Sequence, residues 1–146
     1  MLNADWPARM QKLKNGPLIT LAPDAEIWLD GGHNKAAGHA LSEAISRLQS
    51  RKLFLIVGML NTKDVMGYMQ SLLNKSSDLY GVSIPGEAAT MSAQETVDIA
   101  KDVGFKAIVS ENVESAIKDI VKYDRNARIL ICGSLYLAGN ILKENF

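Results

Sequence analysis

The sequence predicts an α/β fold: a Rossmann-like three-layer sandwich of about six strands and about five helices, mostly parallel, with one antiparallel N-terminal strand. Three observations lead to this prediction. Short apolar runs of strand length alternate with longer segments whose apolar residues recur at helical spacing. Residues Leu53–Val57 (LFLIV) are apolar throughout, which is typical of a strand covered on both faces. A length of 146 residues, 47% of them hydrophobic, fits a single domain with its own core.

The chain begins with a predicted arm, which is followed by a predicted strand pair. Residues 1–15 are polar and mixed in charge, so we expect an arm or linker rather than a signal peptide. Residues 17–22 (PLITLA) and 26–30 (EIWLD) resemble strands, and the short turn between them would make the pair antiparallel. A helix over residues 36–49 follows, because its apolar residues share one face. These residues are Ala37, Leu41, Ala44, Ile45 and Leu48.

The remaining elements alternate between strands and helices. We expect strands over residues 53–57, 79–84, 106–109 and 128–132, and helices over residues 64–73, 92–103, 113–121 and 134–143. Ser92 and Glu95 form a capping-box pattern at the start of a helix that should end at Gly104. Because strands followed by helices run parallel, their carboxyl ends should meet at one edge of the sheet, where ligands bind in such folds.

Charge and cysteine content exclude several classes of protein. Sixteen Lys and Arg residues balance sixteen Asp and Glu residues, so no basic surface for nucleic acid is expected. The longest apolar stretch, residues 53–60, is too short to cross a bilayer. The lone Cys132 excludes an internal disulfide, and we expect it to be buried like Met59, Met66 and Met69. We therefore expect a cytoplasmic, monomeric protein without nucleic-acid or membrane partners.

One predicted strand-to-helix loop carries most of the polar chemistry. It is Asp30-Gly31-Gly32-His33-Asn34, which combines a carboxylate, two glycines, an imidazole and an amide. The glycines would let a ligand approach the backbone, and the helix start would offer N–H groups to an anion. The alternative is a plain turn in which Asn34 caps the helix and Asp30 binds the loop itself.

Other candidate residues also have two interpretations. Ser134 would cap the last helix, or it would present its hydroxyl to a carboxylate, since both roles share one geometry. Lys63 and Asp64 would contact substrate, or they would form an exposed pair at a helix start capped by Thr62. Arg9 would be aimed by the preceding Trp-Pro segment, or it would be a solvated arginine in a loose arm.

Several familiar binding motifs are missing from the sequence. The chain has no Gly-Lys dipeptide and therefore no P-loop, and it has neither G-x-G-x-x-G nor the zinc motif H-E-x-x-H. An α/β domain with a ligand-binding edge but no phosphate-binding loop of its own suggests that something is missing.

Four segments, in this order, make the chain resemble the C-terminal domain of bacterial folylpolyglutamate synthase/dihydrofolate synthase, a relative of the Mur ligases. They are residues 6–9 (WPAR), 29–34 (LDGGHN), 58–60 (GML) with Lys63 and Asp64, and 132–139 (CGSLYLAG). Where that family has P-G-R and D-G-A-H-N-P, this chain has Ala8, Gly32 and Lys35. Lys35 loosens the helix start, because proline would preset it and a cation is unfavourable there.

The resemblance implies that a larger N-terminal P-loop ATPase domain supplies most Mg2+ ligands. The whole enzyme would use ATP to phosphorylate the carboxylate of dihydropteroate or a reduced folate, and L-glutamate would then form the amide. By matching positions, Arg9 would contact the ATP phosphates and Asp30 the ribose. The other matching residues would bind glutamate or substrate, with no catalytic residue or metal ligand in this domain. They are His33, Asn34, Ser134, Lys63 and Asp64.

Two alternative functions remain at this point. The domain could belong to another Mur-type amino-acid ligase of cell-wall synthesis, although the G-S-L-Y-L-A-G segment favours the folate branch. It could also be a nucleotide-binding module without catalysis, in which case no P-loop domain would precede it.

Overall fold

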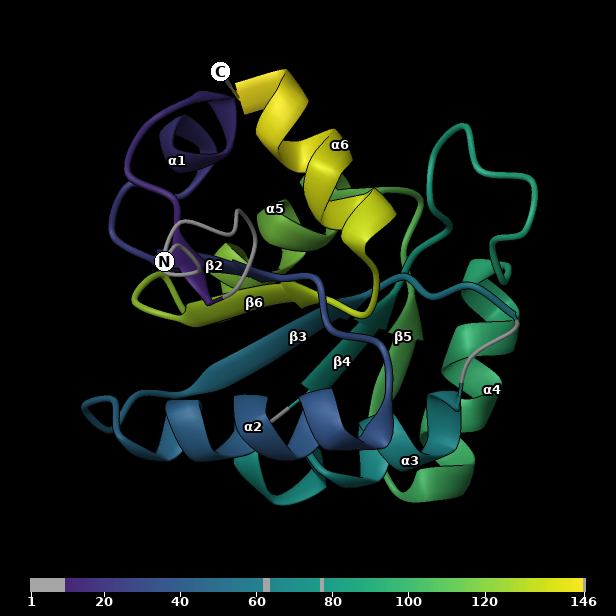
Figure 1. Cartoon of the computed structure of the whole chain (residues 1–146). Coiled ribbons are helices and arrows are strands. Elements are labelled where there is room, and N and C mark those ends of the chain that lie inside the picture. The colour runs from purple at the N-terminus through teal and green to yellow at the C-terminus, as the bar shows by residue number, and fades with distance from the viewer. Residues whose placement is uncertain (1–9, 62–63, 77, 146) are drawn as a thin grey trace, which may run out of the picture.

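The structure, a computed structural model, describes residues 10–61, 64–76 and 78–145 and contains a six-stranded sheet with helices on both faces (Figure 1). The strand order is β1-β2-β6-β3-β4-β5. β1 pairs with β2 antiparallel, and the other pairs are parallel, so the predicted α/β fold is confirmed. The strands are β1 (Gln11–Lys12), β2 (Glu26–Asp30), β3 (Leu53–Val57), β4 (Asp78–Gly81), β5 (Ala107–Val109) and β6 (Arg128–Cys132).

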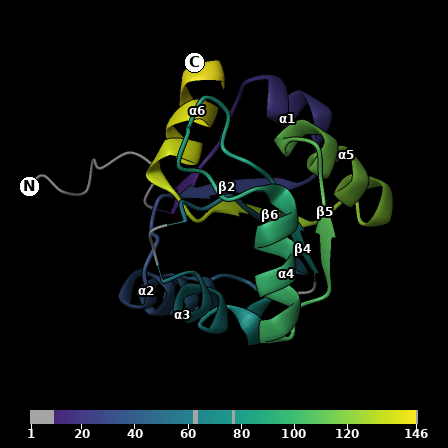
Figure 2. The same ribbon diagram turned by 90° about the vertical axis from the view of Figure 1, so that its right-hand side faces the viewer.

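The helices form two layers, one on each face of the sheet. They are α1 (Pro17–Leu21), α2 (Lys35–Ser46), α3 (Val65–Gln70), α4 (Ala93–Val103), α5 (Val113–Tyr123) and α6 (Leu135–Asn145), with a short 3-10 helix, η2 (Leu73–Lys75). Figures 1 and 2 show α1, α5 and α6 on one face and α2, α3 and α4 on the other. Each layer encloses its own apolar core. Leu18, Ile117 and Ile141 belong to the first core, and Leu41, Tyr68 and Val97 belong to the second.

One predicted strand is a helix in the structure. Residues 17–22, expected to pair with β2, form α1, and the antiparallel partner of β2 is β1, within the predicted arm. Pro17 has no N–H for a sheet ladder but suits the first turn of a helix. Leu18 is then buried in the core that α5 also lines. This helix brings the number of α-helices to six, one more than expected.

The side chains at the helix starts explain several boundaries. The predicted capping box is confirmed, since Ser92 Oγ accepts from Glu95 N–H at 3.0 Å and Glu95 Oε1 accepts from Ser92 N–H at 2.9 Å. The helix ends at Gly104, whose φ is 124°, as predicted. α3 is shorter than expected and is capped by Asp64, while Thr62, the predicted cap, lies outside the described residues. Met66, expected in the core, is 46% exposed because it lies on the outer side of this short helix.

A buried ion pair joins the amino ends of β2 and β6. Arg128, which is 5% exposed, donates from Nε to Glu26 Oε1 at 2.8 Å and from Nη1 to the Gln49 carbonyl at 2.8 Å. Glu26 also pairs with Arg51 at 3.1 Å and accepts from Trp28 Nε1–H at 3.0 Å. Burial opposes ionisation of Glu26, but the hydrogen bonds from Arg128 and Trp28 and the two arginine charges lower its pKa to about 2. Glu26 therefore stays charged at neutral pH.

The helices of the described residues are all too short or too polar to cross a membrane.

Candidate functional site

The parallel pairing of β2 and β6 brings the two most polar loops together at the carboxyl edge of the sheet. Asp30 at the end of β2 is in register with Cys132 at the end of β6, so residues 31–34 and residues 133–134 leave the sheet side by side. The packing between them is close: a Cβ on Gly31 would lie 2.7 Å from Leu135 Cδ2. Gly31 thus allows the first loop to rest on the start of α6.

Asp30 fixes the base of this site. Asp30 is only 9% exposed. Its Oδ1 accepts from Met10 N–H at 3.1 Å, and its Oδ2 accepts from Gly32 N–H at 3.0 Å. The bond within the loop, which the sequence offered as the alternative role, is therefore present. It does not exclude a ligand, because each carboxylate oxygen has two lone pairs. A Cβ on Gly32 would lie 2.6 Å from Ala37 Cβ, so the loop also needs a glycine here.

Asn34 and His33 occupy the transition from the loop to α2. Asn34 Oδ1 accepts from Ala37 N–H at 2.8 Å, which confirms the predicted cap. His33 precedes the cap and is half-buried beside the loop glycines. Capping and ligand binding are compatible here, because the remaining N–H groups of the first turn still point toward the edge.

Ser134 is the corresponding residue at the start of α6. The residue is 2% exposed, and its Oγ accepts from Tyr136 N–H at 3.0 Å, so the predicted capping role is confirmed. Gly133, with φ of 107°, makes the turn before it. A Cβ on Gly133 would lie 2.8 Å from the Gly58 carbonyl oxygen. The loop after β3 is therefore packed directly against the turn that presents Ser134.

A buried tyrosine lies next to the residues of this site. Tyr68 on α3 is fully buried, and its hydroxyl lies beside the Cys132 thiol. Burial, with the neighbouring Cys132 and Asp30, raises the pKa of Tyr68 well above its ordinary value. Burial likewise raises the pKa of Cys132 to about 12, so this thiol stays protonated and is no nucleophile. Sequence reasoning did not single out Tyr68, although its spacing of three residues from Val65 on the predicted helix indicated that the two share a face.

The predicted site residues fall into three groups. Asp30, His33, Asn34 and Ser134 lie together at the β2–β6 edge. Asp64 stands exposed at the start of α3, where its Oδ1 accepts from Gly67 N–H at 3.0 Å. Arg9 and Lys63 lie outside the described residues. Within the described part of the chain, no group of three or more His, Cys, Asp or Glu side chains could hold a metal ion.

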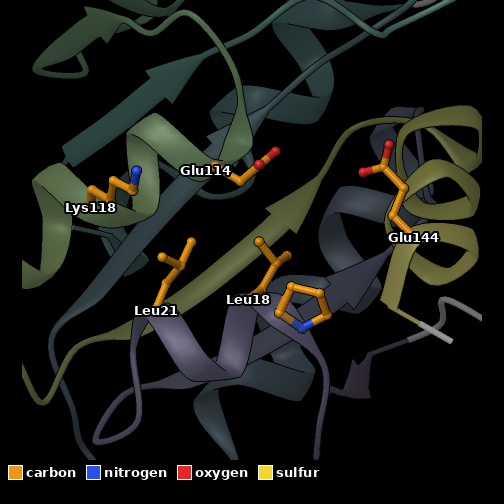
Figure 3. A pocket seen from close by; sticks show the side chains of 6 residues that line it. Leu18, Leu21, Glu114, Lys118 and Glu144 are labelled. Carbon is orange, nitrogen blue, oxygen red and sulfur yellow. The ribbon is translucent and has the colours of Figure 1, made fainter.

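A hollow lies away from this edge, among α1, α5 and α6. It has a volume of about 270 Å3 and an apolar floor that includes Leu18 and Leu21. Glu114 and Lys118 on α5 and Glu144 on α6 surround it (Figure 3). None of the predicted site residues lines it, so its mixed charges are separate from the chemistry of the sheet edge.

Comparison with known proteins agrees with this geometry. The family described as "Dihydrofolate synthetase, C-terminal domain" matches residues 19–144. A probable dihydrofolate synthetase of Schizosaccharomyces pombe is 27% identical over 97% of this chain, which spans 34% of that relative. The chain thus spans about a third or less of the length of these relatives, since the share is 34%, 29% and 16% for three of them.

Solved structures show the same fold. Folylpolyglutamate synthase of Mycobacterium tuberculosis, complexed with ADP, superposes with a TM-score of 0.79 at 20% identity, over 94% of this chain and 32% of that one. A bifunctional folylpolyglutamate synthase/dihydrofolate synthase with Mn, AMPPNP and L-glutamate bound gives 0.73 at 20% identity, over 97% and 32% of the two chains. Since the family match covers most of the chain and the fold agrees, the chain belongs to the dihydrofolate synthetase C-terminal domain family.

Proposed function

We propose that this domain binds substrate in an ATP-dependent ligase that joins L-glutamate to dihydropteroate or a reduced folate through an acyl phosphate. The observation that carries the proposal is the register of Asp30 with Cys132, in a chain of this family. In that register the Asp30–Asn34 loop lies beside the Ser134 turn, which supports a shared edge for the residues we assign to the nucleotide and those we assign to the amino acid.

The site residues suit these two ligands for physical reasons. Asp30 would accept hydrogen bonds from the ribose hydroxyls of ATP, and Arg9 would neutralise phosphate charge. L-glutamate brings carboxylates, and the starts of α2 and α6 offer N–H groups and a favourable dipole to them. His33, Asn34 and Ser134 stand at those two helix starts. Asp64, at the start of α3, would complete the substrate side together with Lys63, its neighbour in sequence.

The proposal includes an N-terminal P-loop ATPase domain of the same protein that closes over this edge. The relatives are about three times as long as this chain, which leaves room for such a domain. Leu135, Tyr136 and Met66 are 46% to 55% exposed and lie at helix starts on this edge. Exposed apolar side chains of this size are typical of contact surfaces. The second domain would supply most ligands of Mg2+ and exclude water from the acyl phosphate.

We place the reaction in the cytoplasm, in a monomeric enzyme with no catalytic residue on this domain. The single cysteine, buried and protonated, is compatible with a reducing compartment.

The experiment that tests the function is a ligase assay with the full-length protein, ATP and L-glutamate, using dihydropteroate and tetrahydrofolate in turn. His33→Ala should raise the KM for glutamate by about tenfold, because a hydrogen-bonding partner is lost. Acyl phosphate should still form without glutamate. His39→Ala is the matched control, since His39 is exposed on α2, beyond the loop.

This 146-residue chain alone should make no amide and bind ATP only in the millimolar range, about −4 kcal/mol. Absence of ligase activity in the full-length protein would refute the proposal. Micromolar ATP binding by this chain alone would favour the nucleotide-binding module instead.

A further inference from the structure

The described part of the arm is attached to the site through one side chain. In the β1–β2 pair, Gln11 lies opposite Leu29 and Lys12 opposite Trp28, so Met10 falls opposite Asp30, one step beyond the ladder. There the Met10 N–H donates to the Asp30 carboxylate at 3.1 Å. Because Leu13 N–H donates to the Ile27 carbonyl, the alternation of the antiparallel ladder makes residues 10 and 30 a non-hydrogen-bonded pair. The bond from Met10 N–H to the Asp30 side chain is therefore additional to the ladder.

The backbone at Met10 shows that this attachment is specific. Its φ is 43°, and Met10 is the one described residue other than glycine with a positive φ. Such a conformation is disfavoured for a residue with a Cβ and persists only where the surroundings hold it. The Met10 side chain packs against the core on the α2 side, whereas Leu13 is buried in the core on the α1 side. The two side chains lie on opposite faces of the sheet, as the alternation of a strand gives, and the positive φ turns the backbone at Met10.

The same carboxylate also binds the 31–34 loop. Asp30 Oδ2 accepts from Gly32 N–H while Oδ1 accepts from Met10 N–H, so one side chain joins two segments about 20 residues apart in sequence. We propose that Asp30 is a positioning residue that clamps the described end of the arm, at Met10, to the 31–34 loop. Any ligand that moves the Asp30 carboxylate would then move the arm, and the coupling would act in both directions.

The clamp can be measured in the 146-residue chain without nucleotide, independently of the proposed function. Amide hydrogen exchange should become about 10- to 100-fold faster at Met10 in Asp30→Ala, because the acceptor is lost. Protection of Ile131 in β6 should persist and report that the domain is folded. Asp124→Ala is the matched control. Asp124 accepts from the N–H of Asn126 at 3.0 Å, two residues further on, just as Asp30 accepts from the N–H of Gly32. Unchanged exchange at Met10 in a folded Asp30→Ala domain would overturn the clamp.

A second variant separates the clamp from a direct contact between Asp30 and ATP, and this step rests on the proposed function. Met10→Pro removes the donor N–H and cannot adopt a φ of 43°, yet it leaves Asp30 intact. Met10→Ala removes the side chain but keeps the N–H. In the full-length enzyme, Met10→Pro should raise the KM for ATP at least fivefold over Met10→Ala, with the KM for glutamate nearly unchanged.

Equal KM values for ATP in the two Met10 variants would show that the clamp does not position the nucleotide site. Absence of ligase activity in the wild-type protein would instead refute the proposed function, and the hydrogen-exchange result would remain valid. If Asp30→Ala does not fold, hydrogen exchange of the Leu13 amide is compared between Met10→Pro and Met10→Ala. Faster exchange in Met10→Pro supports the clamp, and equal exchange overturns it. That amide donates to the Ile27 carbonyl at 2.8 Å in the β1–β2 pairing.

Discussion

Strand β2 carries a carboxylate at each end, and the two differ in what surrounds them. Glu26, at the amino end, is paired with Arg128 and Arg51, so its charge is neutralised by the chain itself. Asp30, at the carboxyl end, accepts from the main-chain N–H groups of Met10 and Gly32. Main-chain donors orient a carboxylate but bring no opposite unit charge.

Because their surroundings differ, we assign Glu26 to the stability of the fold and Asp30 to ligand binding. The Glu26 side chain is 23% exposed and is held by cations on two other segments, so its ionisation is tied to folding. Asp30 lies where α2 and α6 begin, an edge that favours negative ligands. We therefore expect changes at Glu26 to alter the free energy of unfolding and changes at Asp30 to alter the use of ATP.

The largest effect is expected from Glu26→Ala, which should lower the free energy of unfolding by about 3–4 kcal/mol. The cause is that Arg128 stays buried without its carboxylate partner. Urea denaturation of the 146-residue chain measures the change. Asp24→Ala is the control, because its ion pair with Arg125 is exposed and should contribute less than about 1 kcal/mol. Similar losses in both variants would contradict the distinction.

The acid dependence of stability should follow from the same carboxylate. The pKa of Glu26 falls from 4.5 to about 2 on folding, so its contribution is complete above pH 4.5 and is lost as the pH falls toward 2. The difference corresponds to about 3 kcal/mol. Denaturation measured between pH 5 and pH 2 should show a shallower loss in Glu26→Gln than in the wild type. Parallel curves of unfolding free energy against pH would mean that the arginine partners do not lower the pKa of Glu26.

Asp30→Ala should have its main effect on nucleotide use in the full-length enzyme. Loss of a charged hydrogen-bond acceptor should raise the KM for ATP by about 10- to 100-fold, or about 1.5–3 kcal/mol. The KM for glutamate should change much less. Steady-state kinetics with each substrate varied in turn measure both values. An unchanged dependence on ATP would remove Asp30 from the nucleotide site.

A smaller effect on stability than that of Glu26→Ala is expected from Ser134→Ala, at about 1 kcal/mol, because the cap of α6 is lost. Ser92→Ala removes the cap of α4 and should cost a similar amount. The two variants should differ in the KM for glutamate, which should rise only in Ser134→Ala. Equal glutamate kinetics would leave Ser134 with a capping role alone.

Patterns of burial and capping made most of the fold predictable from sequence. β3 is apolar throughout, and β6 is apolar after Arg128, because both of their faces are covered. The Ser92–Glu95 box fixes the start of α4. Residues 17–21 were assigned wrongly because a single turn of helix and a short strand can carry the same apolar residues. Pro17 and Gly16, which favour a helix start, were the available signal.

The site was predictable in its residue types but not in its internal contacts. Parallel strand order brings Asp30, His33, Asn34 and Ser134 to one edge, and a pattern can indicate that. The bond from Met10 to Asp30 depends on the backbone direction at one residue, and no pattern in the sequence encodes it. Likewise, the exposure of Met66 depends on α3 having only six residues.

The position of β6 has a consequence for how the protein is made. β6 is the last strand in the chain, yet it lies between β2 and β3 at the centre of the sheet. Until Arg128–Cys132 has been synthesised, the β1–β2 pair and the β3–β4–β5 unit have no strand to join them, and apolar edges stay open. The two parts of the sheet can thus be joined only after residues 128–132 have become available to pair with both.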